Sequence, residues 1–269
     1  MTTMWPSVAC AVIARTTDAA SEPSLRAALE SVAAVTDECV VVLDDRSPLT
    51  TGAMLEALGA RVVRRTWTDD FAAARNAVHE HVRAPWLLVI DADEVLSSVG
   101  DLPRAIEHAE KEGHQAVLAR VRTTGDHGVG EQLWQFRVYR KASCHWRYPV
   151  HNELVGVESC VPTTAHFLSS YVGTAEAKAA RSLPLLHAQA ALDPDEPRWP
   201  HFLAQTYHAI GDTARMVEHS RRCIALAPDR EAFVHRWCDL ALVHLAESRR
   251  DEALATILEA ARRHADHAD

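Results

Sequence analysis

Short apolar runs recur at intervals through the first third of this 269-residue chain. Val8–Ala14 is the first run, and Cys39–Leu43, Arg61–Thr66 and Trp86–Ile90 follow it. Apolar runs of this length, rich in valine and isoleucine and separated by helical patterns, are typical of parallel strands whose two faces are both covered. The pattern therefore predicts four strands of a mostly parallel sheet.

The stretches between and after these runs predict helices, because they are rich in helix formers and are bounded by capping residues. In chain order they are Pro23–Ala34, Thr50–Leu58, Phe71–Val82 and Leu102–Glu112. The second helix is expected to end at Gly59, and Asp69 or Asp70 is the expected cap of the third. Strands that alternate with helices indicate an α/β fold with helices flanking the sheet.

The pattern changes beyond residue 112. Ala116–Thr123 and Gln132–Arg140 predict two strands joined by a turn-rich segment, which is typical of a hairpin. Cys144–Val157 is short, aromatic and irregular. This part of the chain therefore extends the sheet without continuing the strand–helix alternation.

From about Ala175 onward the chain has only helical patterns. Leu192-Asp193-Pro194 recurs 34 residues later as Leu226-Ala227-Pro228, and 34 residues is the tetratricopeptide (TPR) period. The residues between them that suit the packing and turn of such a repeat are Leu203, Ala204, Tyr207 and Gly211. The tail is either about one and a half degenerate repeats or a plain helical bundle, and the expected domains are residues 1–170 and 171–269.

The net charge and the spacing of the cysteines argue against several classes of function. The formal charge of −9 argues against a general binder of nucleic acids or anionic membranes, since these need stripes of Lys and Arg. None of the six cysteines forms a C-x-x-C pair. A structural zinc site is therefore not expected, and buried free thiols are expected instead. The apolar run Val8–Ala14 is too short for a membrane span and has no basic segment before it. We therefore expect no signal peptide and a cytoplasmic protein.

Two carboxylates follow a buried strand directly, in the sequence Asp91-Ala92-Asp93. Ligands of open α/β sheets bind in the crevice at the carboxyl ends of the strands. A hard cation such as Mg²⁺ or Mn²⁺ is commonly held there by one or two carboxylates together with phosphate oxygens. The spacing therefore predicts a metal and a phosphorylated ligand, and an acidic surface turn is the alternative.

The first half of the chain resembles the glycosyltransferases of family 2, which have a GT-A (Rossmann-like) fold. The segments that carry the resemblance are VACAVIAR, DECVVVLDDRS, WTDDFAAARN, WLLVIDADEVL and RVYRKASCHWRYPVHNELVG. Their order and spacing agree with the family over residues 6–157, and the helical tail resembles the TPR extension of some members. The resemblance implies a nucleotide-diphosphate sugar as donor, most simply a UDP-sugar, and Mn²⁺ or Mg²⁺ as cofactor.

The resemblance also implies a role for individual residues in binding the donor. The residues expected to border the base, hold the base or ribose, and orient the sugar or phosphate are Ala14, Arg15, Thr16, Asp44, Asp45, Arg75 and Asn76. Asp91 is expected at the ribose or the metal, while Asp93 and His151 are expected to bind the metal. An ion pair of Arg75 with Asp69 or Asp70 is the structural alternative, as is a loop histidine at position 151.

The catalytic base is the least specific of these expectations. An inverting transferase needs a base that takes the proton of the acceptor hydroxyl. Glu153 is the first candidate and Asp126, in the hairpin turn, is the second. The family's usual His-Glu reads His151-Asn152-Glu153 here, which moves the carboxylate by one position. Asp45-Arg46-Ser47-Pro48 departs from the small Thr-Gly-Ser stretch usual after the second strand. Thr16-Thr17-Asp18 replaces the Asn-Glu usual after the first strand, so base recognition is expected to differ.

The sequence thus predicts a metal-dependent, inverting glycosyltransferase that acts on a glycan, protein or other acceptor, most simply at a hydroxyl. The helical tail is expected to contact the acceptor or to form a homodimer. A catalytically inactive scaffold that works through its TPR-like helices is the alternative. Nucleotidyl transfer on the same fold is a third reading, which the lack of a glycine-rich phosphate loop near the N-terminus disfavours.

Overall fold

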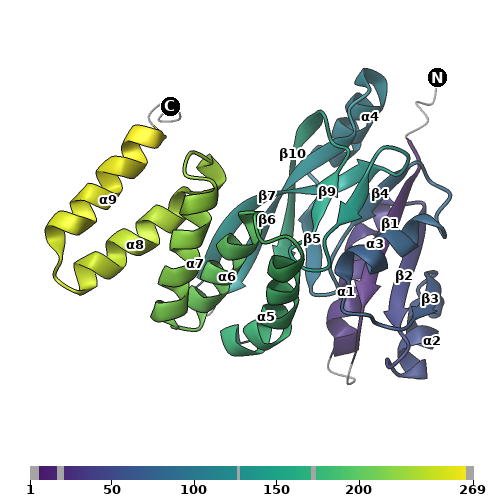
Figure 1. Ribbon diagram of the computed structural model, residues 1–269. Coiled ribbons are helices and arrows are strands. Elements are labelled where there is room, and N and C mark those ends of the chain that lie inside the picture. The colour runs from purple at the N-terminus through teal and green to yellow at the C-terminus, as the bar shows by residue number, and fades with distance from the viewer. Residues whose placement is uncertain (1–5, 17–20, 126–127, 171–173, 265–269) are drawn as a thin grey trace. The chain divides into compact units, whose positions relative to one another are not determined.

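The structure is a computed structural model that describes residues 6–16, 21–125, 128–170 and 174–264, without the side chains of residues 124–131. The chain forms two compact units, Met1–Val172 and Gly173–Asp269. The first unit is an α/β domain and the second contains helices (Figure 1).

The first unit is organised around an eight-stranded sheet in the order β3-β2-β1-β4-β7-β6-β10-β5. Its strands are β1 (Val8–Ala14), β2 (Glu38–Asp44), β3 (Arg61–Arg65), β4 (Trp86–Val89), β5 (Glu94–Ser98), β6 (Ala116–Gly125), β7 (Gly128–Arg140) and β10 (Cys160–Ser169). Strands β3, β2, β1 and β4 are parallel to one another. Strand β7 is antiparallel to both β4 and β6, β10 is parallel to β6, and β5 is antiparallel to β10.

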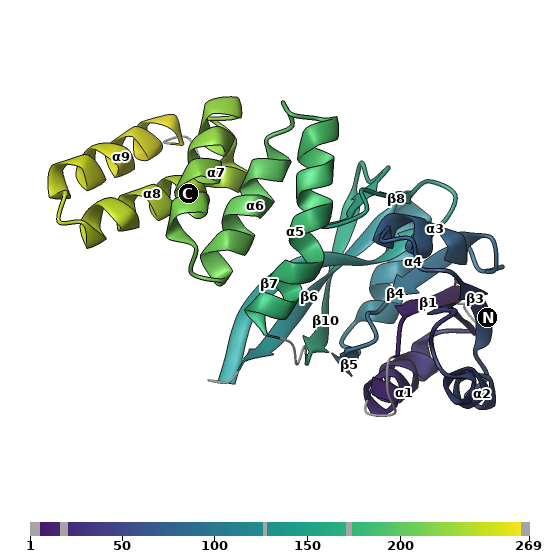
Figure 2. The ribbon, with the colours of Figure 1, turned by 60° about the horizontal axis from the view of Figure 1, so that its bottom comes forward.

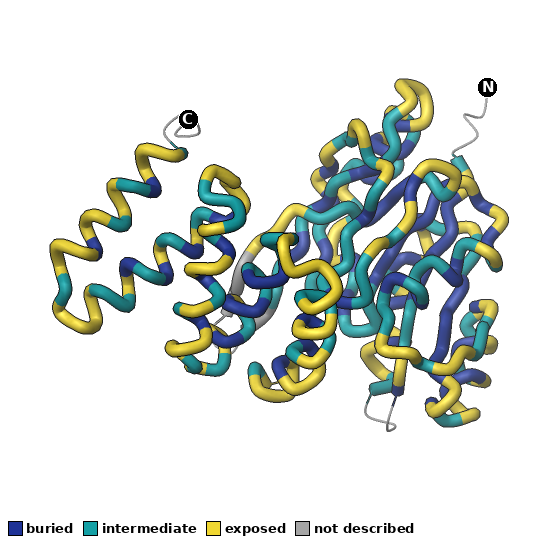
Figure 3. The backbone as a smooth tube through the Cα atoms, in the orientation of Figure 1, coloured by how far each residue is buried: buried dark blue, intermediate teal, exposed yellow. Residues whose placement is uncertain are grey.

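Helices cover both faces of the sheet because its central strands are apolar on both sides. Helices α1 (Glu22–Val32), α2 (Leu49–Ala57) and α4 (Leu102–Glu112) contribute to one apolar core, and a short 3-10 turn, Ala33–Val35, follows α1. Helix α3 (Phe71–His79) contributes to a second core, together with the small sheet of β8 (His145–Arg147) and β9 (Glu153–Val155). In Figure 3 the strands between these layers are predominantly buried.

The four parallel strands and the hairpin strands are confirmed, with small differences at their ends. Strands β5 and β10 had not been predicted. The β5 segment, Glu94–Ser98, is short and ends in two exposed serines, and β10 carries a proline at position 162. Both strands therefore lack the apolar pattern of the others, and β5 pairs with a strand about 70 residues away in the sequence.

The Gly100-Asp101 dipeptide attaches the start of α4 to β10. Gly100 has φ +51°, and a side chain there would meet Thr164 and the backbone of Ala165 within 2.8 Å, so glycine is required. Oδ1 of Asp101 accepts hydrogen bonds from the Thr163 hydroxyl at 2.6 Å and from the Thr164 backbone and hydroxyl at 2.7 and 2.9 Å. These bonds, foremost that from Thr163, hold the pKa of Asp101 below its ordinary value.

We therefore expect Asp101→Ala to lower the free energy of unfolding by about 1–3 kcal/mol, because three donors lose a charged acceptor. Asp101→Asn keeps the acceptor and removes the charge, so its loss should be smaller. A lowered pKa means that the folded state binds fewer protons, so this contribution is present at neutral pH and is lost as the pH falls below about 4. Urea unfolding of the wild type and Asp101→Asn at several pH values measures it, and a difference that stays constant down to acid pH would contradict the assignment.

The second unit consists of successive antiparallel helices (Figure 2). They are α5 (Ala175–Leu192), α6 (Arg198–Ala209), α7 (Thr213–Leu226), the 3-10 turn Glu231–Phe233, α8 (Val234–Ala246) and α9 (Arg250–Arg263). Leu203, Ala204 and Tyr207 of α6 are buried, and Gly211 in the following turn has φ +75°. These are the packing and turn positions that the 34-residue repeat predicts.

All six cysteines are free thiols, but only Cys10, Cys144 and Cys223 are buried as expected. Cys39 and Cys160 are partly buried, and Cys238 is exposed. No helix in the described ranges combines the length and apolarity that a membrane-spanning segment requires.

Candidate active site

The turn between β4 and β5 presents Asp91 and Asp93 at the carboxyl ends of the parallel strands. The backbone N–H of Glu94 donates to the Asp91 carbonyl at 3.0 Å, and the Asp91 N–H donates to the Glu94 carboxylate at 3.1 Å. The Asp93 carbonyl accepts hydrogen bonds from Ser170, at the end of β10, at 2.9 and 3.1 Å. The turn is thus fixed both internally and to a distant strand, so the two carboxylates are held by a rigid backbone.

Two arginines hold the Asp91 carboxylate. Arg75 of α3 donates to Oδ1 at 2.5 Å, and the Arg137 guanidinium of β7 lies 3.9 Å from Oδ2. Burial alone would raise the pKa of Asp91, but the charges of Arg75 and Arg137 and the hydrogen bond from Arg75 outweigh it and lower that pKa. Asp91 is therefore an anion whose orientation the protein determines. The sequence had offered Asp69 or Asp70 as alternative partners of Arg75, and Asp70 instead caps α3 by accepting from the Ala73 N–H at 2.8 Å.

A buried ion pair lies beside this carboxylate. Nη2 of Arg137 is 2.5 Å from Oε1 of Glu94, and both side chains are 4% exposed. Burial raises the pKa of Glu94 to about 7 despite the opposing charge of Arg137. The sequence analysis assigned no role to either residue. The available signal was an arginine within the apolar run of β7, but its partner lies 43 residues away.

Asp44, at the end of β2, is the second carboxylate at this edge of the sheet. It accepts from the backbone N–H, Nε and Nη2 of Arg46 at 2.9, 3.1 and 2.8 Å, and Nε of Arg15 lies 3.5 Å away. The hydrogen bonds from the Arg46 side chain lower the pKa of Asp44 more than its burial raises it. Asp45 is exposed and accepts from the Thr66 hydroxyl at 2.7 Å. The unusual Arg46 is thus a partner of the predicted base-binding carboxylate.

The residues that follow β1 have two different environments. The side chain of Arg15 is about half exposed beside Asp44, whereas Thr16 is buried. The Thr16 N–H donates to Ser47 at 3.1 Å, and its hydroxyl lies 3.0 Å from that of Thr51 on α2. Thr16 therefore attaches the segment that follows β1 to Ser47 and to α2. Among the residues predicted to border the base, Ala14 and Arg15 are partly or fully accessible.

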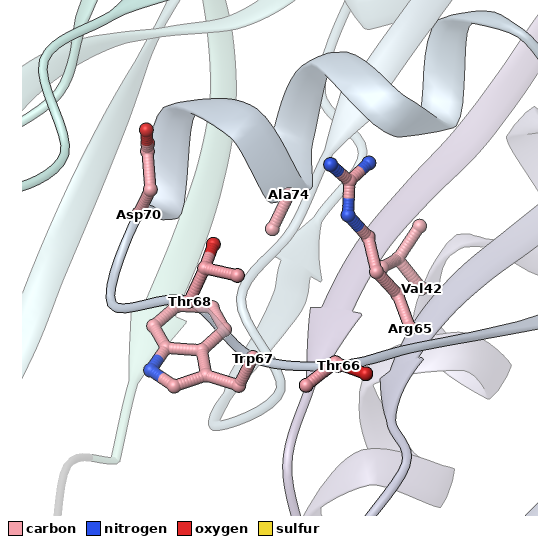
Figure 4. Close-up of a pocket in the computed structure, with 7 residues that line it drawn as sticks. All are labelled: Val42, Arg65, Thr66, Trp67, Thr68, Asp70 and Ala74. Atoms are coloured by element: carbon pink, nitrogen blue, oxygen red, sulfur yellow. The ribbon is translucent and has the colours of Figure 1, made fainter.

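A hollow lies beside this corner, between the start of α3 and the segment that follows β3 (Figure 4). The residues that line it are Val42, Arg65, Thr66, Trp67, Thr68, Asp70 and Ala74. Arg65 is the register partner of Asp44 across β3 and β2. The hollow therefore adjoins the Asp44 corner on the face of the sheet that α3 covers.

Asn76, which is predicted to help orient the sugar or phosphate, has both ends of its amide bonded to the backbone of Trp146. Its amide donates to the carbonyl of Trp146 at 2.8 Å and accepts from the N–H of Trp146 at 2.8 Å. The Trp146 ring in turn lies 4.8 Å from the Arg75 guanidinium. Asn76 thus fixes β8 to α3 through both ends of its amide. This contact also places the Trp146 ring beside Arg75, which helps to position that arginine.

The remaining predicted residues are not brought together into a metal cluster. Within residues that the structure describes, no group of three or more His, Cys, Asp and Glu side chains could hold a metal ion, so the predicted set of Asp91, Asp93 and His151 is not preassembled. His151 has a left-handed backbone with φ +47°. Glu153 on β9 lies 3.3 Å from the Arg147 guanidinium, and Asp126 lies outside the described residues.

The sequence has relatives of known class. A family model described as glycosyl transferase family 2 matches residues 12–165. The SPbeta prophage-derived glycosyltransferase SunS of Bacillus subtilis is 21% identical over 169 residues, which are 59% of this chain and 40% of SunS. A TPR repeat-containing protein of Synechococcus elongatus is 43% identical over 68 residues, which are 25% of this chain and 17% of that protein. The chain spans less than half the length of these two relatives.

Crystal structures of S. aureus TarS share the fold. A structure of TarS 1–349 in complex with UDP-GlcNAc has a TM-score of 0.51 and 12% identity, with 96% of this chain and 92% of that chain covered. A longer TarS structure has a TM-score of 0.50 and 13% identity, with 92% of this chain and 54% of that chain covered. At this level of identity the likeness is one of fold, and it agrees with the α/β class predicted from the sequence.

Proposed function

Because the chain belongs to glycosyl transferase family 2, we propose that it transfers a sugar from a nucleotide-diphosphate sugar to an acceptor hydroxyl. The observation that carries the proposal is that Asp44, Asp91 and Asp93 share the carboxyl edge of the parallel strands, with arginines beside the first two. This edge is where open α/β sheets bind their ligands. Carboxylates suit the base and ribose, and arginines suit a diphosphate.

A UDP-sugar is the donor that we propose. Asp44 provides an acceptor at the base corner, and Arg15 and Arg46 provide donors beside it. The imide edge of uracil has one N–H between two carbonyl oxygens, so an acceptor flanked by donors suits it. Binding requires Arg46 to share or leave Asp44, which is feasible because the Arg46 side chain is 57% exposed. The UDP-GlcNAc complex of TarS, which has a similar fold, supports the same donor class.

We propose that Asp93 holds a Mn²⁺ or Mg²⁺ ion together with the diphosphate. Such ions are commonly bound by one or two carboxylates plus phosphate oxygens, so a closed cluster of protein ligands is not required. The fit rests on the place of Asp93 in the turn between β4 and β5, where Ser170 donates to its backbone carbonyl and fixes the residue at the carboxyl ends of the parallel strands. His151 remains a proposed further contact. When bound, the ion would stabilise the negative charge that develops on the leaving diphosphate.

The chain's own residues would orient the donor and accept the proton. Asp91 keeps Arg75 in place, and the positive charge of Arg75 beside this edge favours the diphosphate before and after the sugar leaves. Glu153 remains the proposed base for an inverting reaction, in which the acceptor oxygen attacks the anomeric carbon as the bond to the diphosphate breaks. The Arg147 guanidinium lies 3.3 Å from the Glu153 carboxylate and holds its position on β9.

The function can be tested with purified protein and a panel of UDP- and GDP-sugars. Each sugar is added with Mn²⁺, with Mg²⁺ or with a chelator, and both the thermal midpoint and the released nucleoside diphosphate are measured. We expect UDP-sugars with a divalent ion to raise the midpoint and to be hydrolysed or transferred. If no nucleotide sugar stabilises the protein or is turned over under any of these conditions, the proposed function is wrong.

A further inference from the structure

The last helical hairpin of the second unit exposes an unusual amount of apolar surface. Among the described residues, nine large apolar side chains are exposed, and five of them lie on α8 and α9. They are Leu242, Leu245, Leu254, Ile257 and Leu258. Single exposed leucines are common on protein surfaces, but a group of this size on one hairpin is typical of an interaction surface.

One face of helix α9 carries four exposed residues in a defined order. Asp251, Leu254, Leu258 and Arg262 follow one another at spacings of three, four and four residues, which places them on one face of the helix. All four are exposed, with Leu254 at 59% and Leu258 at 52%. The face therefore runs from an acid, through two leucines, to a base.

Two copies of this face are complementary to each other when the helices lie antiparallel. If a second copy of α9 lies antiparallel against the first, Asp251 meets Arg262, Leu254 meets Leu258, and the same two contacts recur across the two-fold axis. Interfaces of two-fold dimers have this property, because each residue i that contacts j is matched by a residue j that contacts i. Ile257 lies close to the centre of the pairing and adds apolar area.

We propose that the chain forms a two-fold homodimer through the antiparallel pairing of α9, in which Asp251 of each protomer faces Arg262 of the other. Leu254 and Leu258 form the apolar centre of the interface, and the two charge pairs fix the direction and register of the helices. The proposal concerns the second unit and is independent of the sugar-transfer chemistry.

The intramolecular partner of Arg262 does not prevent this pairing. Arg262 lies 2.8 Å from Glu259 one turn earlier, and its side chain is 74% exposed. Exposed ion pairs of this kind stabilise a helix by a few tenths of a kcal/mol, so their exchange for an intermolecular pair is feasible. Glu259 would remain close to Arg263, which it contacts at 2.7 Å.

Reversal of the charges tests the pairing in the full chain. Asp251→Arg sets two arginines against each other at both ends of the interface, and Arg262→Asp does the same with two aspartates. Each single variant should raise the dimer dissociation constant by roughly 100-fold, because like charges then face each other twice. The double variant Asp251→Arg/Arg262→Asp restores opposite charges and should dimerise like the wild type. Sedimentation equilibrium over a dilution series measures all four proteins.

Two controls separate the interface from the stability of the helix. Both substitutions place unfavourable charges at the helix ends, so the double variant should have the less stable α9 even though it regains the dimer. Glu112→Arg, at the exposed end of α4 in the first unit, matches the charge change of Asp251→Arg and should leave association unchanged. A monomeric wild type, single variants that dimerise normally, or a double variant that stays monomeric would each overturn the proposal.

Discussion

Asp93→Ala is expected to lower kcat/KM for the nucleotide sugar by roughly 100- to 1,000-fold while the protein stays folded. The reason is that Asp93 is the carboxylate at the sheet edge that we propose holds the metal. Loss of metal stabilisation of a leaving diphosphate corresponds to roughly 3–4 kcal/mol of activation free energy. Steady-state kinetics in saturating Mn²⁺, with circular dichroism to confirm folding, measures the effect.

The control for this variant is Asp195→Ala, which removes an aspartate that is 85% exposed in the second unit. It should keep wild-type kinetics. Binding provides a second measurement, because UDP should stabilise the wild type more strongly with Mn²⁺ than without it. Asp93→Ala should lose this metal-dependent increment and keep the metal-independent part. If Asp93→Ala retains activity and its response to Mn²⁺, the metal assignment fails although the sugar-transfer proposal can still hold.

Arg137→Met is expected to lower the free energy of unfolding by about 3–5 kcal/mol, the usual effect of removing one member of a buried ion pair. The variant leaves Glu94 almost completely buried without its counter-charge. Because the pKa of Glu94 is already raised to about 7, this carboxyl can take up a proton at little expense, and the loss should be nearer the lower end of the range. Denaturant unfolding at neutral pH measures it.

A double variant separates the structural role of Arg137 from its action on Asp91. Arg137→Met/Glu94→Leu replaces both charges by apolar groups and should regain much of the lost stability. Its activity should stay low, because Asp91 has still lost the second arginine, and its backbone N–H has lost the Glu94 carboxylate that accepts from it. Arg122→Met, on the same sheet, is the matched control and should change neither quantity by much. A double variant with both stability and activity restored would show that the pair is merely structural.

The features of the site that depend on residues close together in the sequence could be predicted. The aspartates at positions 44, 91 and 93 end strands whose apolar runs are continuous, so their place at one edge follows from parallel topology alone. Asp70 as the cap of α3 follows from the same local rules. These features need no knowledge of which distant segments meet.

What the sequence could not reveal depends on long-range pairing. Arg137 finds Glu94 only because β7 lies beside β4 in the sheet, and Asn76 finds Trp146 across 70 residues because β8 packs on α3. Without that topology, Asn76 looks like a ligand contact beside Arg75. Strand β5 is short and half exposed, so its identity depends on its pairing with β10. The interactions that could not be predicted were therefore mainly those between polar residues far apart in the sequence.

The central claim is that a nucleotide sugar binds at the carboxyl edge of the parallel strands. A crystal structure of this chain with UDP and Mn²⁺ tests it most directly. We expect the uracil and ribose beside Asp44, the diphosphate near Arg75, and the ion between the diphosphate and Asp93. A nucleotide bound elsewhere on the protein, or an ion that does not contact Asp93, would contradict it.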